Sequence, residues 1–411
     1  MIEIDAMKGL RRIQIVSWTV AAVLLLVVCA AIHGADTLPG RLTDDEFWKL
    51  VEASSEPSGS FLSENFTSNE NGFQTVIPSL LRVTRRDGVY LGVGPEQNFT
   101  YVLAMHPKIA FIIDIRRQNL LEHLMYKAIF EMADNRAEFL SILFSCKRPP
   151  GLTTETTIDR LLDAYLKAYQ NANIDDAVFR ANLHSIENRL TEKHGFKLSA
   201  GDLETIEHVL NVFHAYGPQI HYNSKYPAVD AASPIGNFQG TNFATVMSAA
   251  DMSGKQRGFL ASEENYRQIR DFEMKNLVVP VVGDFGGPTA LRAVGQYLKD
   301  HGATVSAFYV SNVEQYLFQQ SMLQIDVDPN GRGASHPSVV GAARNFYNNV
   351  AALPLDETSV FIRSGTPNMG GIGSSYYTNF SQLSPILVML DAFKTGVILR
   401  YSDVFNIRIP E

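Results

Sequence analysis

Hydrophobic and polar positions alternate between short apolar runs and amphipathic stretches in two separate parts of the chain. The apolar runs predict strands at Val89–Val93, Ile109–Ile115, Leu277–Val282, Thr304–Val310, Ser359–Arg363 and Val397–Tyr401. The stretches with helical spacing predict helices at Pro95–Met105, Leu120–Ser145, Pro288–His301, Val313–Leu323 and Ser384–Gly396. Strands that alternate with helices are typical of a doubly wound, mostly parallel sheet. We therefore predict a Rossmann-like α/β fold.

A helical stretch interrupts this alternation. Pro149, Pro150 and Gly151 end the first α/β part. Beyond them the pattern predicts only helices, at Ile158–Tyr169, Asp175–Thr191 and Ala200–Tyr216. The predicted organisation is an N-terminal segment (1–35), the first half of the Rossmann-like domain (36–150), a helical insertion (151–270) and the second half of the domain (271–411).

Two further segments lie outside the alternation. Residues 36–75 are polar and include a short predicted helix at Asp44–Ala53; this lead-in is either a surface connection or a loop that folds over a ligand. Residues Asp326–Ser338 read as a Gly, Pro and Asp loop. Ser384 and Pro385 stand where they would cap and begin the last predicted helix.

The N-terminal segment contains an uncharged apolar run. Ile13–Ile32 is twenty residues long, enough for a helix to span roughly the 30 Å of hydrocarbon in a bilayer. Lys8, Arg11 and Arg12 precede it, which predicts a cytoplasmic N-terminus and an extracytoplasmic folded domain. A retained single-pass anchor is the first interpretation. The alternatives are a lipoprotein signal and a cleaved signal peptide, the latter giving a secreted or periplasmic protein.

Composition excludes several classes of function. The formal net charge of -8 gives no basic face for nucleic acid. The two cysteines, Cys29 and Cys146, exclude a disulfide framework and a cysteine metal cluster. Glu204 and His208 have a spacing that permits metal binding, but no third ligand is evident, and we predict no metal site. The sequence does not indicate an oligomeric state.

The strongest chemical motif is a glycine turn after the first predicted strand. Gly92 and Gly94 follow that strand, and Asp114 lies twenty residues after Gly94, near the end of the next apolar strand. This layout is typical of a nucleoside-binding β-α-β unit, in which the acidic residue accepts hydrogen bonds from ribose hydroxyls. The glycine pair also suits a plain tight turn, and Asp114 also suits a cap on the following helix.

Two residues in the turn argue against a dinucleotide. Gln97 stands where the fingerprint requires its third glycine, and Glu96 lies in the helix turn that would face a pyrophosphate. A carboxylate there repels phosphate charges at short range, whereas a cationic or neutral ligand meets no such conflict. S-adenosylmethionine, which carries a sulfonium, is therefore the expected cofactor. An oxidoreductase that uses a nicotinamide cofactor is a weaker alternative.

Four segments carry a resemblance to a known family: YLGVGPEQNFTYV, AFIIDIRRQNLLEHLMYKAIFEM, NLVVPVVGDFGGPTALRAVGQYL and FYVSNVEQYL. The chain resembles class I S-adenosylmethionine-dependent methyltransferases, and more closely an uncharacterised bacterial family of methyltransferase-like proteins. The resemblance covers most of residues 75–400. It implies the following cofactor-binding residues: Gly92 and Gly94 at the methionine part, Asp114 at the ribose, Asp284 at the adenine edge and Asn312 near the methyl group. Active relatives carry an acid where Tyr90 stands, and Glu96 is the candidate to supply that charge.

A polar cluster follows Asp114 at the predicted ligand-facing edge. Arg116, Arg117 and Asn119 form a candidate clamp for an acidic substrate, or alternatively a solvated helix start. His123, one turn further and next to Glu122, is a candidate general base or a structural side chain.

Two functions follow from these expectations. The first is a membrane-anchored methyltransferase-like enzyme that modifies a small acceptor. The second is a non-enzymatic exported module on the same fold, which binds a different ligand or a protein. The predicted topology favours the second, because S-adenosylmethionine is made in the cytoplasm. The motif favours the first.

Overall fold

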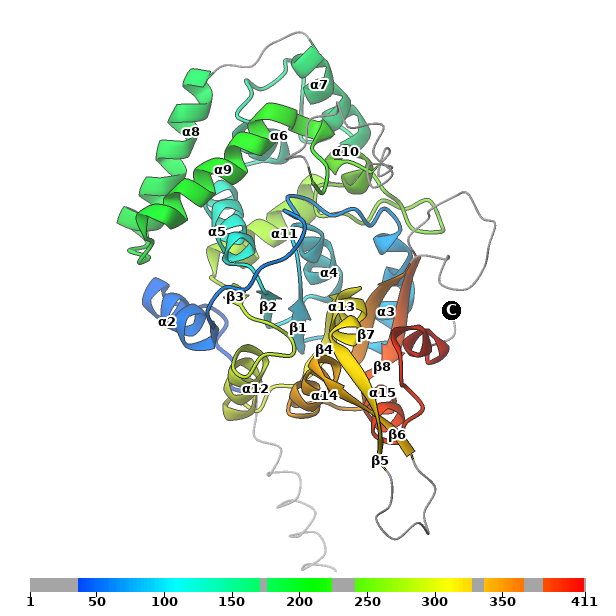
Figure 1. Cartoon of the computed structure of the whole chain (residues 1–411). Coiled ribbons are helices and arrows are strands. Elements are labelled where there is room, and N and C mark those ends of the chain that lie inside the picture. The colour runs from blue at the N-terminus through cyan, green and yellow to red at the C-terminus, as the bar shows by residue number, and fades with distance from the viewer. Residues whose placement is uncertain (1–35, 171–175, 224–240, 327–335, 366–379, 410–411) are drawn as a thin grey trace, which may run out of the picture.

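A mostly parallel six-stranded sheet forms the centre of the computed structural model, which describes residues 36–170, 176–223, 241–326, 336–365 and 380–409 (Figure 1). Its strands are β1 (Val89–Gly92), β2 (Ile109–Asp114), β3 (Val278–Val282), β4 (Val305–Ser311), β7 (Val360–Gly365) and β8 (Phe380–Pro385). The order is β3-β2-β1-β4-β7-β8, with β8 antiparallel to β7 and all other neighbours parallel. The predicted mixed α/β class with a mostly parallel sheet is confirmed.

The topology creates a switch point between β1 and β4. The chain winds outward from β1 through β2 to β3, and then crosses back to place β4 on the other side of β1. In open sheets of this kind, ligands bind outside the carboxyl ends of the strands where the winding reverses. The turn after β1 and the residues after β2 therefore lie where a ligand site is expected.

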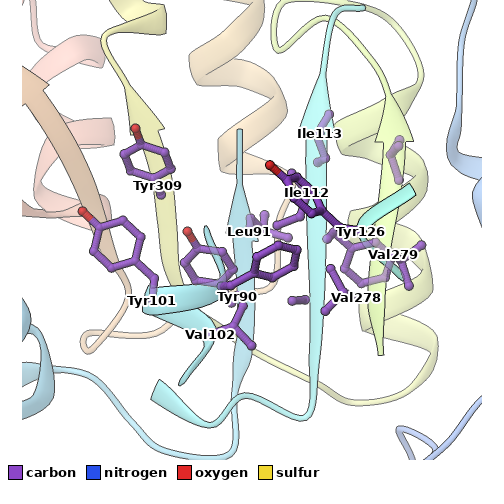
Figure 2. Close-up of a cluster of buried hydrophobic side chains, with 14 of the residues drawn as sticks. Tyr90, Leu91, Tyr101, Val102, Ile112, Ile113, Tyr126, Val278, Val279 and Tyr309 are labelled. Carbon is purple, nitrogen blue, oxygen red and sulfur yellow. The ribbon is translucent and has the colours of Figure 1, made fainter. Parts of the chain in front are cut away.

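Helices cover both faces of the sheet. Adjacent residues of β4 show this, because consecutive side chains of a strand point to opposite faces. Tyr309 packs against Tyr101 of α4 (Gln97–Met105), with ring centroids 5.2 Å apart. Phe308 packs against Phe346 of α14 (Ala342–Ala351), at 6.3 Å. Figure 2 shows Tyr90, Tyr101 and Tyr309 together on the α4 face of the sheet, in the same hydrophobic cluster as Tyr126.

The long helix predicted over residues 120–145 is wrong, because the structure divides it in two. Helix α5 (Arg117–Met132) ends at Ala133, whose backbone is extended, and α6 (Arg136–Leu143) begins after Asn135. The side chain of Asn135 accepts a hydrogen bond from the backbone amide of Glu138 at 3.0 Å. Asparagine is a favoured N-cap residue, so the second helix has its own start signal.

The second half departs further from prediction. The predicted helix Val313–Leu323 ends early, as α13 (Val313–Gln319). Where the end of that helix and a loop were predicted, β5 (Ser321–Asp326) and β6 (His336–Gly341) pair as an antiparallel ribbon. The predicted strand Val397–Tyr401 is absent, and a 3₁₀ helix, η5, covers Tyr401–Asn406.

The start of the last helix also differs. Ser384 belongs to β8, and its hydroxyl donates to the carbonyl of Ile407. It therefore does not cap α15 (Ile386–Lys394), for which Pro385 is the N-cap residue. The remaining predicted helix of this half is present as α12 (Ala290–Asp300).

The described residues between 151 and 270 form helices joined by irregular segments, with no strand among them. Their longer helices are α7 (Ile158–Gln170), α8 (Asp176–Asn188), α9 (Ala200–Tyr216) and α11 (Glu263–Met274), and a short helix, α10, covers Phe243–Met247. A π-helical turn at Arg189–Lys193 follows α8. Figure 1 shows α7, α8, α9 and α10 beyond the carboxyl ends of β1, β2 and β3, where α9 packs on α5.

The first helix of the described residues is α2 (Asp44–Ser54), close to the helix predicted there. A 3₁₀ turn, η1 (Phe73–Val76), and α3 (Ile77–Val83) lead into β1. The segment Ile13–Ile32, predicted to span the membrane, lies outside the described residues. Among the helices that the structure describes, none has the length and apolar character that a bilayer crossing needs.

Candidate functional site

Residues 55–72, between α2 and η1, form a strap across the carboxyl ends of the parallel strands (Figure 1). The strap meets the strands in their order in the sheet. Its contacts are Glu56 with Val282 of β3, Gly59 with Ile115 after β2, Ser68 with Glu96 after β1, and Glu70 with Ser311 of β4 and Ser364 of β7. The polar lead-in therefore does fold over the edge where a ligand is expected.

Two charged side chains fasten the strap. Arg116 donates from Nη1 to the backbone carbonyls of Ser63 at 2.9 Å and Glu64 at 2.5 Å. At the other end, the Glu70 carboxylate accepts hydrogen bonds from four side chains: Tyr309 (2.8 Å), Ser311 (2.5 Å), Gln97 (3.2 Å) and Ser364. Hydrogen bonds to a charged group are about twice as strong as neutral ones. The strap thus forms one wall of this region.

The two glycines of the turn have different roles. A Cβ atom at Gly92 would lie 2.0 Å from Oδ1 of Asn98 and 2.8 Å from the ring of Tyr90. The glycine at this position therefore leaves the space that these two side chains occupy. Gly94 has a φ of +79°, which glycine adopts without strain, and no atom lies within 4 Å of where its side chain would point. Gly94 is itself buried.

Asn98 organises the turn and was missed by the sequence interpretation. Its Nδ2 donates to the carbonyls of Val93, Gly94 and Pro95 at 3.0, 3.1 and 2.8 Å. Its Oδ1 accepts a hydrogen bond from the Tyr90 hydroxyl at 2.8 Å. Tyr90, which stands where active methyltransferases carry an acid, is therefore part of the scaffold of the turn.

Asp114 lies at the end of β2, where it was predicted, and is 4% exposed. Its Oδ1 accepts a hydrogen bond from the backbone amide of Arg116 at 2.9 Å and lies 3.7 Å from Nε of the same residue. Burial raises the pKa of this carboxyl, against the lowering effect of the Arg116 charge and of the backbone amides of Arg116 and Gly94. Asp114 therefore links the glycine turn to the start of α5.

A polar stripe runs along one face of α5. Asn119, Glu122, His123 and Tyr126 lie at positions i, i+3, i+4 and i+7, which share a helix face. Each is at least 98% buried. Nε2 of His123 lies 2.9 Å from the Gly94 carbonyl, and burial lowers the pKa of His123 to about 4. The neutral imidazole thus donates from Nε2 to that carbonyl and leaves Nδ1 as an acceptor.

Most polar atoms of this stripe make no hydrogen bond within the described part of the chain. The Tyr126 hydroxyl faces Glu122, but without hydrogen-bond geometry. The described residues contain nineteen buried side-chain nitrogen or oxygen atoms without a hydrogen bond. Nine of them belong to the stripe, to Glu96 or to Arg116: Glu96 Oε2, Arg116 Nε and Nη2, Asn119 Nδ2 and Oδ1, Glu122 Oε1 and Oε2, His123 Nδ1 and Tyr126 Oη. Buried polar groups nearly always have partners, and their exceptions mark strained or functional places.

The carboxylates outnumber the cations in this cluster. Asp114 and Glu122 both interact with the Arg116 guanidinium, and Glu96 lies close enough to act on Glu122. Burial raises the pKa of Glu96 to about 7, although Thr67 and Ser68 donate hydrogen bonds to it. Burial also raises the pKa of Glu122 well above its usual value, and the nearby Glu96 charge adds to this. A ligand that brings positive charge would relieve this excess.

The same residues fall within a recognised family. The family described as Domain of unknown function (DUF7790) matches residues 65–200 and 240–327, which together are more than half of the chain. The chain belongs to the DUF7790 family. No curated protein matches the sequence. The first matched stretch contains the glycine turn, Asp114 and the whole stripe of α5, so the candidate site lies inside the family domain.

Three predicted site residues of this DUF7790 member lie away from the cluster. Arg117 forms a two-pronged pair with Asp202 of α9, at 2.5 and 2.9 Å. The Asp284 carboxylate accepts from the backbone amide of Gly286 at 2.8 Å, within its own turn. Asn312 follows β4 and is partly exposed.

Other predicted site residues lie closer to the glycine turn. Asp114 and His123 interact with Gly94, Arg116 contacts Asp114, and Glu96 begins α4 directly after the turn. Asn119 lies one helical turn before His123 on α5. Among the described residues, no three His, Cys, Asp or Glu side chains are placed to hold a metal ion. The sequence interpretation missed Glu70 and Tyr126 and assigned Glu122 no role. The sequence signal for Tyr126 and Glu122 was the helical spacing of polar side chains along α5. The structure buries that helix on nearly all sides.

Proposed function

We propose that this DUF7790 member is a methyltransferase-like protein that binds S-adenosylmethionine, or its demethylated product, beside the glycine turn. The observation that carries the proposal is the group of nine buried polar atoms without a hydrogen bond in the described chain, on Glu96, Arg116 and α5, the helix whose His123 contacts the glycine turn. Leaving buried polar groups unsatisfied costs roughly 1–3 kcal/mol each, so their gathering in one place needs a reason. A polar ligand enclosed there would supply the partners.

The residues present fit this cofactor in three respects. Asp114 closes the second strand of the β-α-β unit, where an acid can accept hydrogen bonds from a ribose diol. Gly94 leaves room for a close approach to the backbone. A cationic ligand would favour the ionised forms of Glu96 and Glu122, which would repel a diphosphate when charged. Bound S-adenosylmethionine would supply an electrophilic methyl group at this position.

The chain's own contribution would be binding, orientation and exclusion of water. The strap covers the strand ends, and the site residues beneath it are almost wholly buried. Enclosure of this kind strengthens electrostatic interactions and keeps solvent from the reacting groups. Entry of a ligand then requires part of the strap, at residues 63–70, to move away from Arg116 and Glu96.

Equilibrium dialysis of the full-length protein against labelled S-adenosylhomocysteine tests the proposal, because dialysis tolerates slow opening of the strap. We expect saturable binding that Asp114→Asn weakens at least tenfold, about 1.4 kcal/mol. Glu204→Gln, an exposed change on α9, is the control and should bind as the wild type does. Absence of binding by the wild type at millimolar ligand, after long equilibration, would exclude this function.

A second candidate is a non-enzymatic exported module on the same fold. It is favoured by the strap, whose Glu70 already accepts four hydrogen bonds and whose Thr67 and Ser68 bind Glu96. In this alternative the strap is the permanent occupant of the strand ends, and Ile13–Ile32 anchors the domain outside the cytoplasm. A C-terminal reporter enzyme that is active only outside the cytoplasm tests the topology. An inactive reporter would place the domain in the cytoplasm and exclude this candidate. It would also remove the objection to the first function, namely that S-adenosylmethionine is made in the cytoplasm.

A further inference from the structure

We infer that the polar stripe of α5, together with Glu96, is a binding site for an organic ammonium group. The inference deepens the proposed function and rests on it where the ammonium belongs to the nucleoside ligand. The first observation concerns hydrogen-bond acceptors. Four buried oxygen atoms lack a hydrogen-bond partner in the described residues: Oε1 and Oε2 of Glu122, Oε2 of Glu96 and Oδ1 of Asn119. An ammonium group is a compact donor of up to three hydrogen bonds and needs such convergent acceptors.

The acidic groups alone would not define a site, and Asn119 provides an independent observation. Its side chain is 1% exposed, yet neither its amide nitrogen nor its amide oxygen has a partner in the described residues. An asparagine buried in this way pays for desolvation at two atoms. It lies one helical turn before Glu122, on the same face of α5, so the two side chains are neighbours on the helix surface.

Aromatic rings line the site as well. The ring of Phe99 meets His123 and Tyr126 edge to face, each with centroids 5.6 Å apart. The rings of His123 and Tyr126 are 6.2 Å apart. Aromatic faces attract ammonium ions when these are desolvated, and recognition sites for substituted ammonium commonly combine rings with a carboxylate. The surroundings therefore suit an alkylated ammonium as well as a primary one.

Charge balance supports the inference. Among the described residues, the charged or titratable groups shown to act on Glu122 are Glu96 at the start of α4, Asp114 at the end of β2, and Arg116 and Tyr126 on or beside α5. His123 is the next residue of α5. Because His123 is neutral, Arg116 is the one cation shown to act on this group of three carboxyl groups in the described residues. Without a bound cation, protons must neutralise the excess. Binding of an ammonium ion should therefore release protons from Glu96 and Glu122.

The ammonium group has two possible sources. It is either the amino group of the nucleoside ligand's own amino-acid part, or the amino group of a separate small amine. Three probes separate these sources for the full-length protein: S-adenosylhomocysteine carries nucleoside and ammonium, 5′-methylthioadenosine carries the nucleoside alone, and methylammonium chloride carries the ammonium alone. Each is titrated calorimetrically into wild type, Glu122→Gln and the exposed control Glu204→Gln, with salt matched by potassium chloride.

The variants give distinct outcomes. If the nucleoside brings the ammonium, Glu122→Gln weakens S-adenosylhomocysteine at least tenfold and leaves 5′-methylthioadenosine unchanged. If a separate amine brings it, methylammonium binding is saturable in the wild type and lost in Glu122→Gln. In either case, titrations in buffers of different ionisation enthalpy should show proton release. Tyr126→Phe, which keeps the ring, provides a second variant with the same expected direction should Glu122→Gln fail to fold.

Two results overturn the inference. One is equal affinity of wild type and Glu122→Gln for both ammonium-bearing probes. The other is a wild type that responds neither to S-adenosylhomocysteine nor to methylammonium. Failure of the proposed function looks different: neither nucleoside binds, while methylammonium still binds through Glu122.

Discussion

The hydroxyl of Thr67 donates a 2.6 Å hydrogen bond to Oε1 of Glu96, which joins the strap directly to the start of the helix after the glycine turn. The backbone amide of Ser68 reaches the same oxygen at 3.1 Å. Thr67 and Glu96 are fully buried, so this contact is shielded from water. The wall of the candidate site and the cover over it are therefore one connected structure.

Removing the Thr67 hydroxyl should loosen the strap. Thr67→Val keeps the shape of the side chain but takes one of two donors from a buried carboxylate, which should cost about 1–3 kcal/mol of stability. Hydrogen–deuterium exchange should then quicken at residues 63–70 more than elsewhere, because the strap is fastened there. Thr205→Val on α9 is the control, since its hydroxyl bonds only to a helix carbonyl. Unchanged exchange at 63–70 would show that other contacts fix the strap.

The two glycines of the turn should respond differently to alanine. In Gly92→Ala the new methyl group would overlap Oδ1 of Asn98, so we expect a loss of several kcal/mol from overpacking and from disturbance of the turn. Gly94→Ala meets no atom, and its cost should be about 1 kcal/mol for a positive φ. Its methyl group would, however, stand in the space assigned to the ligand. Chemical denaturation and ligand dialysis of the pair measure both effects. Equal destabilisation by the two changes would contradict these roles.

The first β-α-β unit was predictable because its signals are local. An apolar run of strand length, a glycine turn and an acid near the end of the next run occur within one short stretch of chain. Side chains at the ends of neighbouring parallel strands meet at one edge, so the convergence of Asp114, Arg116 and Glu96 follows from strand order alone. Asn119 and His123 follow from helical spacing.

Contacts between distant segments were not predictable in this way. Glu70 binds Ser311 and Ser364, more than 200 residues away in the sequence, and nothing near Glu70 indicates those partners. The pairing of Arg117 with Asp202 is of the same kind. A charged side chain near a strand end suits a ligand or a distant partner equally well until the fold brings that partner close.

The second half was harder because its strands depend on pairing. Ser321–Asp326 mixes apolar and polar residues and directly follows a helix, so it reads as the end of that helix. Its strand conformation is fixed by hydrogen bonding with His336–Gly341. Short segments of this type adopt the conformation that their neighbours permit, because strand propensity depends strongly on context.

Stability should depend on pH through Glu96. Its pKa is raised from 4.5 to about 7, mainly by burial, so between these values the folded state holds a proton that the unfolded state has released. The contribution of Glu96 is therefore most favourable below pH 4.5 and is lost as the pH rises through 7, by about 3 kcal/mol in total. Relative to wild type, Glu96→Gln should gain stability between pH 5 and pH 8. Urea denaturation at both pH values measures this, with the exposed Glu204→Gln as a flat reference.

A comparison of two glutamates on α5 tests whether the polar stripe exists for a ligand. Glu131 is buried but well paired: Lys127, Arg189, Lys193 and His194 all lie within 3.2 Å of its carboxylate. Glu122 is more deeply buried and has no hydrogen bond at either oxygen. The same substitution, glutamate to methionine, therefore removes a satisfied group in one case and an unsatisfied group in the other.

The two substitutions should change stability in opposite directions. Glu131→Met leaves cations without their partner and should cost about 3–5 kcal/mol. Glu122→Met replaces an unsatisfied carboxyl by an apolar side chain of similar length, and should stabilise the protein by about 1–3 kcal/mol. Denaturation of both variants without ligand measures this. A stability gain at Glu122 coupled to loss of ligand binding is the pattern of a residue kept for function, because natural proteins retain destabilising groups where activity needs them. A loss at Glu122 as large as at Glu131 would mean that its carboxyl has a structural partner, and the ammonium site would lose its main support.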